Sequence, residues 1–160
     1  MSLSGGMDST ALLMKMLSDG YEVTCISYDY GQKHRIEIDR AKANIEYLLQ
    51  NGISVEHVVI DLTSAMGSLN SALTRDEISV PEGHYESEQM RQTVVPNRNA
   101  IFSAILYGHA LSISESESTD VAIALGVHSG DHVIYPDCRP EFYESLEKAL
   151  SMGNWGSDRI

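Results

Sequence analysis

Strand-like and helix-like segments alternate along the 160 residues, and this alternation restricts the fold more than any other feature. Apolar, β-prone runs predict strands over residues 21–28, 53–62 and 121–127. Apolar residues spaced three or four apart predict helices over residues 9–19, 34–51, 99–112 and 140–152. Because parallel strands are joined through helices, this order predicts an α/β fold, with a doubly wound, mostly parallel sheet and helices on both faces. We expect one domain over residues 1–160.

The alternation is interrupted within the chain and stops abruptly at its ends. Between residues 63 and 94 the pattern lapses into a Ser-, Gly-, Glu- and Asn-rich stretch, which predicts a functional or flexible loop. Only residues 1–3 precede the first glycine-rich turn, so the first strand is expected to be a shortened stub. Trp155 follows the last helix with little left to pack against. We therefore expect a chain truncated at both ends.

The amino-acid composition limits the kinds of molecule that the chain is expected to bind. Eleven Lys and Arg against twenty-three Asp and Glu give a net charge of −12, which argues against binding nucleic acid through its phosphates. The chain has no apolar run long enough to span a membrane and no leader-like N-terminus. Cys25 and Cys138 stand far apart, as in a protein of a reducing compartment, and we expect a cytoplasmic location. No local spacing of Cys or His indicates a metal site.

The stretch SGGMDST, residues 4–10, combines turn residues with the start of a helix. Glycines let backbone N–H groups converge on an anion, and the helix dipole adds to the attraction, so the stretch predicts a phosphate cradle. It lacks the lysine of a Walker loop and the spacing of a dinucleotide loop. Asp8 would repel a bare phosphate, which leaves two roles for it: a ligand of Mg²⁺ or a helix cap.

Two further stretches carry polar side chains near predicted strand ends or helix starts. YDYGQKHRIE begins at Tyr28, where Gln32 and His34 can read a base edge or a phosphate, or can simply form a polar helix entry. VVPNRNAIF begins at Val94, where Arg98 offers a planar fork for an anion. Asn99 can cap the helix that follows or take part in binding.

The densest polar cluster lies in ALGVHSGDHVIYPDCRPEF, residues 124–142. It starts as a buried strand and ends as a helix start, and such density after a strand is typical of a substrate pocket. The polar residues between are His128, Asp131, His132, Tyr135, Asp137, Cys138 and Arg139.

SGGMDST resembles the signature of the PP-loop ATP pyrophosphatases, an adenine nucleotide α-hydrolase-like, Rossmann-like fold. With YDYGQKH, PNRN and GVHSGDHVIYPDCRPEF in the same order, essentially the whole chain resembles the QueC family of 7-cyano-7-deazaguanine synthases. YPDCRPEF is specific to that family among PP-loop proteins. The resemblance implies a ligase of queuosine biosynthesis that converts 7-carboxy-7-deazaguanine, ammonia and ATP to the nitrile preQ0. The carboxylate is adenylated, ammonia displaces AMP to give an amide, and a second activation dehydrates the amide.

The resemblance also implies roles for residues. The loop would hold the β- and γ-phosphates of ATP, with Asp8 near Mg²⁺ and Arg98 stabilising charge at phosphorus. The implied nucleotide-binding residues are Leu3, Ser4, Gly5, Gly6, Met7, Asp8, Ser9 and Thr10. The implied substrate-binding residues are Gln32, His34, Asp131, Tyr135, Asp137 and Arg139. Among these, Asp137 suits the guanine-like amidine edge, and Arg139 suits the substrate carboxylate unless it only packs at the helix start.

The family's zinc, a further implied cofactor, is bound by a cysteine cluster beyond the point where this sequence stops, so no metal ligands are expected in this chain. A homodimer is implied as well. Three other functions stay open: another PP-loop ligase acting on tRNA, against which the acidic charge argues, a non-catalytic nucleotide-binding module, and a structural fragment that binds neither ligand.

Overall fold

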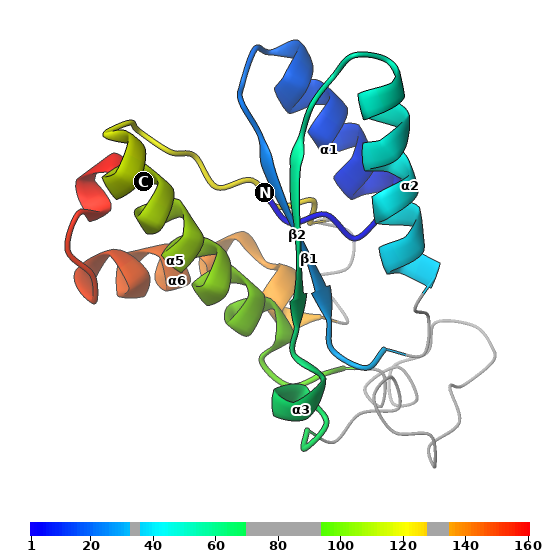
Figure 1. Ribbon diagram of the computed structural model, residues 1–160. Helices are drawn as coiled ribbons and strands as arrows, with labels where there is room; N and C mark the ends of the chain where they lie inside the picture. The colour runs from blue at the N-terminus through cyan, green and yellow to red at the C-terminus, as the bar shows by residue number, and fades with distance from the viewer. Residues whose placement is uncertain (33–35, 70–93, 128–134) are drawn as a thin grey trace.

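Helices and strands alternate along the chain in the order that the sequence predicts (Figure 1). The computed structural model describes residues 1–32, 36–69, 94–127 and 135–160. In chain order the elements are α1 (Met7–Ser18), β1 (Thr24–Asp29), α2 (Ile36–Gln50), β2 (Glu56–Asp61), α3 (Thr63–Met66), α5 (Arg98–Glu117), η2 (Pro136–Cys138), α6 (Pro140–Met152) and η3 (Ser157–Arg159). Every predicted helix and the first two predicted strands are confirmed. The short helix α3 opens the predicted loop over 63–94, and residues 70–93 of that loop lie outside the described part of the chain.

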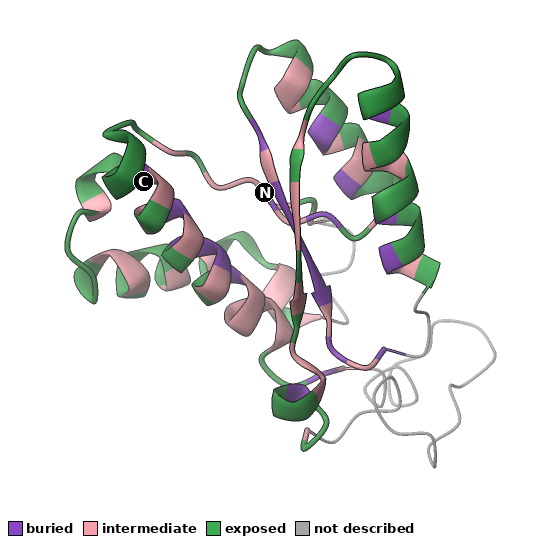
Figure 2. Cartoon of the chain, in the orientation of Figure 1, coloured by how far each residue is buried: buried purple, intermediate pink, exposed green. Residues whose placement is uncertain are grey.

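β1 and β2 form a parallel pair. Their register runs from Thr24 opposite Glu56 to Asp29 opposite Asp61. β1 is buried along most of its length, whereas β2 alternates between half-buried and exposed positions (Figure 2). β1 is therefore an inner strand, and β2 lies toward the outside of the sheet.

The expected stub at residues 1–3 pairs with the other side of β1. Ser2 forms a parallel bridge with Ile26. Ile26 N–H donates to the Met1 carbonyl and Leu3 N–H donates to the Ile26 carbonyl, each over 2.8 Å. The N-terminal nitrogen of Met1 donates to the Thr24 carbonyl at 2.6 Å. Three residues are thus enough to continue the sheet by one short strand and to hold the turn that follows it.

The segment 121–127 lies beside the stub, but it does not form the predicted strand. Ser2 N–H donates to the Ala124 carbonyl at 3.2 Å, and Val121 N–H donates to the Arg159 carbonyl at 2.8 Å. The prediction of a regular strand here is wrong: among the described residues one backbone hydrogen bond joins the segment to the stub, whereas a ladder needs repeated pairs. The spatial order is β2, β1, stub and segment 121–127.

Helices cover both faces of this sheet (Figure 1). Alternate residues of β1 point to opposite faces. On the face of α1 and α2, the buried cluster consists of Met1, Leu3, Leu13, Val23, Cys25, Ala41 and Leu48. On the face of α5, it consists of Ile26, Tyr28, Tyr30, Met66, Val95 and Leu106. The two-sided core confirms the α/β layering, and it fixes the stub between the two layers.

Helix ends differ from the sequence prediction in two informative places. α1 begins at Met7, two residues before the predicted start, so part of the glycine-rich stretch is helical. α5 continues to Glu117, five residues past the predicted end, with Ser114 buried and the three residues after it exposed. Ser118, with φ +54°, ends the helix, and the Ser114 hydroxyl donates to the Thr119 carbonyl at 2.6 Å.

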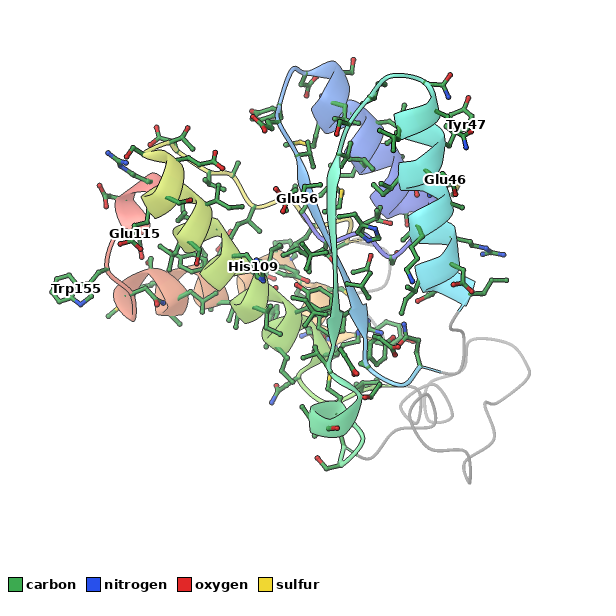
Figure 3. All side chains as sticks on the ribbon, viewed as in Figure 1. Glu46, Tyr47, Glu56, His109, Glu115 and Trp155 are labelled. Atoms are coloured by element: carbon green, nitrogen blue, oxygen red, sulfur yellow. The ribbon has the colours of Figure 1, made fainter. Side chains whose placement is uncertain are left out.

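The surface confirms one expectation about the C-terminal end. Trp155 points away from the ribbon (Figure 3), and the residue is 98% exposed.

Both cysteines are free thiols, with Cys25 buried and Cys138 half-buried. Among the described helices, none has the length and apolar character needed to cross a membrane.

Candidate functional site

The turn between the stub and α1 is pressed against the first turns of α2. Gly5 has φ +77°, a conformation that L side chains rarely adopt. A Cβ atom at Gly5 would lie 2.5 Å from the Glu37 carbonyl oxygen and 2.6 Å from the Ala41 nitrogen. Only a glycine fits here, so the turn approaches α2 more closely than any other residue would allow.

Hydroxyl groups tie this turn together. Gly6 is the residue before the helix, and its carbonyl accepts from the Thr10 hydroxyl at 2.8 Å and from the Ser9 hydroxyl at 3.2 Å. Ser9 Oγ also accepts from Ser4 N–H at 3.2 Å, and Asn44 of α2 donates to Thr10 Oγ1 at 2.9 Å. Because the Thr10 hydroxyl proton is donated to the Gly6 carbonyl, Thr10 shapes the turn and does not point a free donor outward.

Asp8 does not cap α1. The cap position belongs to Gly6, which has no side-chain cap hydrogen bond, and Asp8 is the second residue of the helix with its side chain exposed. The capping interpretation of Asp8 is therefore wrong. The residue remains free to meet a cation outside the turn.

A cavity of about 290 Å³ opens beside this turn, near the carboxyl end of β1. Its volume is at the lower end of the range typical for small-molecule sites. The turn, β1, the starts of α2 and α5, segment 125–127 and α6 all contribute to its wall. The lining residues are Ser2, Leu3, Ser4, Ser9, Ser27, Tyr28, Tyr30, Gln32, Glu37, Ile38, Arg98, Asn99, Phe102, Ser103, Leu125, Gly126, Val127 and Tyr143. Ligands of open α/β sheets bind at this kind of place, outside the strand carboxyl ends.

Arg98 brings a positive charge to the cavity from the first residue of α5. Its Nε donates to Asn99 Oδ1 at 3.3 Å. Burial raises the pKa of the Tyr30 phenol, and the nearby Arg98 guanidinium opposes that rise. Arg98 therefore faces the cavity beside an aromatic hydroxyl that stays protonated at neutral pH.

Asn99 also lines the cavity, but it does not cap α5. Asn97 is the residue before the helix and takes a left-handed conformation with φ +56°. The capping interpretation of Asn99 is wrong, because Pro96 and Asn97 complete the turn and leave Asn99 inside the first helical turn. Its amide nitrogen donates to the Asp137 carbonyl at 3.4 Å, which ties η2 to α5.

Tyr143 of α6 closes the cavity on the side of Arg98. Burial, with smaller contributions from Cys138 and Asp137, raises the pKa of the Tyr143 phenol to about 12, against the opposing effect of Arg98. The phenol is therefore a neutral hydrogen-bond donor across the physiological range.

Comparison with known proteins assigns the chain to a family. The family described as queuosine biosynthesis protein QueC matches residues 1–159. The chain belongs to the QueC family. A curated 7-cyano-7-deazaguanine synthase of Alteromonas mediterranea is 46% identical over 154 residues, which cover 95% of this chain and 65% of that protein. Proteins of the same name from Hahella chejuensis and Methanoregula boonei are each 42% identical, over 95% and 96% of this chain and 62% and 66% of their own lengths. The chain thus spans about two thirds of the length of these relatives.

Of the residues that the QueC resemblance implies for nucleotide binding, Leu3, Ser4 and Ser9 line the cavity, together with Arg98. Gly5 and Gly6 form the adjoining turn, and Met7, Asp8 and Thr10 stand in the first helical turn. Met7 is 84% exposed. The described structure therefore brings the two predicted components, turn and arginine, to one cavity.

The implied substrate residues are less concentrated. Gln32 lines the cavity, but its buried amide already accepts from Tyr30 N–H at 2.9 Å and donates to the Tyr28 carbonyl at 3.2 Å. Tyr135, Asp137 and Arg139 stand on or beside η2 and are not among the described lining residues. His34 and Asp131 lie outside the described residues, as do His128 and His132.

Sequence reasoning missed the aromatic wall of the cavity. The rings of Tyr28 and Phe102 stack with centroids 4.1 Å apart and planes 9° apart, and the Tyr30 ring is tilted against Phe102 at 5.4 Å. The signal was present in the sequence: Tyr28 and Tyr30 share one strand face at the strand end, and Phe102 lies one helical turn after Arg98. Tyr143 had no such signal, because its place depends on the packing of α6.

Proposed function

We propose that this chain carries the nucleotide-binding and adenylating part of a 7-cyano-7-deazaguanine synthase. In this proposal the chain uses ATP to adenylate the carboxylate of 7-carboxy-7-deazaguanine, ammonia displaces AMP, and a second activation converts the amide to the nitrile. The observation that carries the proposal is the convergence of the SGGMDST turn and Arg98 on one cavity in a QueC-family chain. The shared name of the curated relatives supports it.

In the proposed mechanism the turn binds the two phosphates that leave as pyrophosphate. The backbone N–H groups at the start of α1 would donate hydrogen bonds to the phosphate oxygens, and the helix dipole also favours the negative charge there. Arg98 would stabilise the charge that develops at the α-phosphorus as the substrate oxygen attacks. The neutral Tyr143 phenol would donate a hydrogen bond to an oxygen of the α-phosphate. The aromatic wall of Tyr28 and Phe102 offers a flat apolar surface for a purine-like ring.

In this proposal Mg²⁺ binds to the chain together with ATP. Among the residues that the structure describes, no group of three or more His, Cys, Asp or Glu side chains could hold a metal ion. Asp8 is exposed at the turn and is the carboxylate that would reach an ion carried by the phosphates. The ion would then take most of its ligands from the nucleotide and water, as Mg²⁺ commonly does. Within the described ranges no such group is present for the family's zinc either, and no step is assigned to that metal.

We also propose roles for the substrate-facing residues and features of the whole protein. Asp137 and Arg139 would read the amidine edge and the carboxylate of the substrate. Tyr135, Gln32, His34 and Asp131 are proposed as further substrate-binding residues, of which His34 and Asp131 lie outside the described part of the chain. The sheet would be doubly wound, and the whole protein would be a cytoplasmic homodimer. A net charge of −12 fits small-molecule substrates better than nucleic acid.

The deciding experiment follows the nucleotide and the product together. The chain is incubated with Mg·ATP, ammonia and 7-carboxy-7-deazaguanine, and AMP, pyrophosphate and the nitrile are quantified by mass spectrometry. We expect AMP and pyrophosphate in every turnover. ADP and orthophosphate would contradict the PP-loop mechanism. AMP without the amide or nitrile would support adenylation and contradict the complete synthase activity.

Matched variants test the two residues with proposed charge roles. Arg98→Lys is expected to lower kcat/KM about a hundredfold, since a point charge cannot replace the planar fork, and Arg159→Lys on η3 is its control. Asp8→Asn is expected to weaken the Mg²⁺ dependence of nucleotide binding, with Asp39→Asn on the exposed face of α2 as control. Equal behaviour of a variant and its control would remove that residue from the mechanism.

A further inference from the structure

A line of side-chain hydrogen bonds runs from the outer strand β2 to the entry of the phosphate turn. His57 of β2 and Ser27 of β1 are joined by a hydrogen bond of 2.8 Å between Nε2 and Oγ. The Ser27 hydroxyl donates in turn to the Leu3 carbonyl at 2.5 Å. Leu3 is the last residue of the stub and directly precedes Ser4. The line thus links a half-buried histidine to the residue from which the turn departs.

The donor and acceptor capacities of the three groups decide where each proton in this line points. A carbonyl oxygen can only accept, so the single Ser27 hydroxyl proton points to Leu3. Ser27 Oγ must then accept from His57, and the proton of the neutral imidazole must be on Nε2. Burial and the nearby Lys42 ammonium lower the pKa of His57, which favours this neutral form at neutral pH. Bonds aligned in this way polarise and strengthen one another.

The Leu3 carbonyl depends on this line. Leu3 N–H is paired with the Ile26 carbonyl at 2.8 Å, but no backbone N–H of the described residues donates to the Leu3 carbonyl. Leu3 is 1% exposed and Ser27 is 2% exposed, so the hydrogen bond between them joins two buried residues. A buried carbonyl without a partner is costly, and the Ser27 hydroxyl supplies the partner that the short stub cannot.

We propose that His57 is a positioning residue for the phosphate turn: it orients the Ser27 hydroxyl, which holds the Leu3 carbonyl and thereby sets the direction of the N–H groups from Ser4 onward. This inference rests on the proposed function, because it takes the turn to be the ATP phosphate site. His57 itself is outside the cavity lining and acts through Ser27, which is part of it.

The first experiment measures the Kd of the full chain for Mg·α,β-methylene-ATP, an analogue that cannot be cleaved at the α–β bond. His57→Leu and Ser27→Ala each remove one link and are expected to weaken binding about tenfold, the effect of about one hydrogen bond. His57→Gln keeps an N–H donor near the place of Nε2 and is expected to stay within about threefold of the parent chain. The double variant His57→Leu with Ser27→Ala should bind no more weakly than Ser27→Ala alone.

A second cross-strand side-chain bond on the same strands provides the matched control. Thr24 Oγ1 donates to Glu56 Oε2 at 3.0 Å, at the opposite end of β1 and β2 from the phosphate turn (Figure 3 labels Glu56). Glu56→Ala removes this bond and is expected to leave the nucleotide Kd unchanged. Thermal unfolding of every variant separates loss of fold from loss of turn position.

Two spectroscopic readouts do not need the nucleotide. Long-range proton–nitrogen NMR of the parent chain is expected to show His57 protonated on Nε2, with His57→Gln assigning the signal among the six histidines. The amide signals of Gly5 and Gly6 are expected to shift in Ser27→Ala and His57→Leu but not in Glu56→Ala. A proton on Nδ1, or glycine signals that move equally in the control, would overturn the proposal even if a variant proved unstable.

The outcomes separate this inference from the proposed function. If the parent chain binds the analogue and folded His57→Leu binds equally well, or if His57→Gln is as weak as His57→Leu, the positioning role is wrong and the nucleotide site stands. If the parent chain binds no nucleotide while the glycine signals respond to Ser27 and His57, the proposed function is wrong and the link from His57 to the turn stands.

Discussion

Gly126 lies against the backbone of Ser9. A Cβ atom at Gly126 would stand 3.1 Å from both the nitrogen and the Cα of Ser9. Segment 121–127 therefore meets the start of α1 so closely that a side chain at Gly126 would require a shift of a few tenths of an ångström, and this close approach forms one wall of the cavity next to the phosphate turn. Gly126 does not have a positive φ, so its place is explained by the close contact with Ser9 and not by its backbone conformation.

A first prediction follows for this contact. Gly126→Val is expected to push the first turn of α1 away and to weaken nucleotide binding by about tenfold, the effect of about one lost hydrogen bond to the phosphates. Gly108→Ala is the control: Gly108 is inside α5 with nothing near its Cβ position. That change should stabilise the helix by about 0.5–1 kcal/mol and leave the nucleotide Kd unchanged. Isothermal titration decides, and equal Kd values for Gly126→Val and the parent chain would contradict the prediction.

A second prediction concerns the other side of the turn. Gly5→Ala combines a left-handed backbone with a collision against the Glu37 carbonyl and the Ala41 nitrogen. Gly52 has a similar φ of +80° but nothing near its Cβ position, so Gly52→Ala imposes the backbone strain alone. We expect about 1–2 kcal/mol of destabilisation from Gly52→Ala and clearly more from Gly5→Ala, measured by urea unfolding. Equal losses would mean that the turn can move off α2.

Local patterns predicted the elements and the phosphate turn, because helix and strand periods and the SGGMDST chemistry are properties of neighbouring residues. The stub at residues 1–3 was also predictable, since only three residues precede the turn. Segment 121–127 has the composition of a strand but forms none, because a strand needs a partner of sufficient length. The left-handed conformation of Asn97, which precedes α5 in the position that the sequence suggested for Asn99, was not visible as a capping pattern.

The site was predictable only where its residues adjoin a motif. Arg98 follows a turn and was found, whereas Tyr143 and Ser27 come to the cavity through the packing of α6 and the pairing of β1. His57 stands in a strand whose composition only predicted β structure. Its link to Leu3 depends on the register between β1 and β2 and on the pairing of the stub, which no local pattern contains.

A third prediction separates the two contacts between Tyr28 and Phe102. Besides the stacking of the rings, the Tyr28 hydroxyl donates to the Phe102 carbonyl at 2.9 Å. Tyr28→Phe removes the hydrogen bond, keeps the stack, and is expected to lower the free energy of unfolding by about 1 kcal/mol. Trp155→Ser, at a side chain that is 98% exposed, should change it by less than about 0.5 kcal/mol. Urea unfolding followed by circular dichroism measures both, and a loss from Trp155→Ser equal to that from Tyr28→Phe would show that Trp155 has a packing partner.

The last prediction concerns alkaline pH. Burial raises the pKa of the Cys25 thiol from 9.0 to about 11, and the N-terminal ammonium only partly opposes this. A thiol that ionises less readily in the folded chain contributes stability that is complete below pH 9 and is lost as the pH rises toward 11. We therefore expect the free energy of unfolding to begin to fall at about pH 9 and to go on falling toward pH 11, with the first part of the fall below the ordinary range of tyrosine ionisation. Cys25→Ala should flatten this slope. Leu13→Ala, in the same buried cluster, should reduce stability but keep the slope. The measurement is urea unfolding at half-unit pH steps, and the same slope in Cys25→Ala and the parent chain would show that another group is responsible.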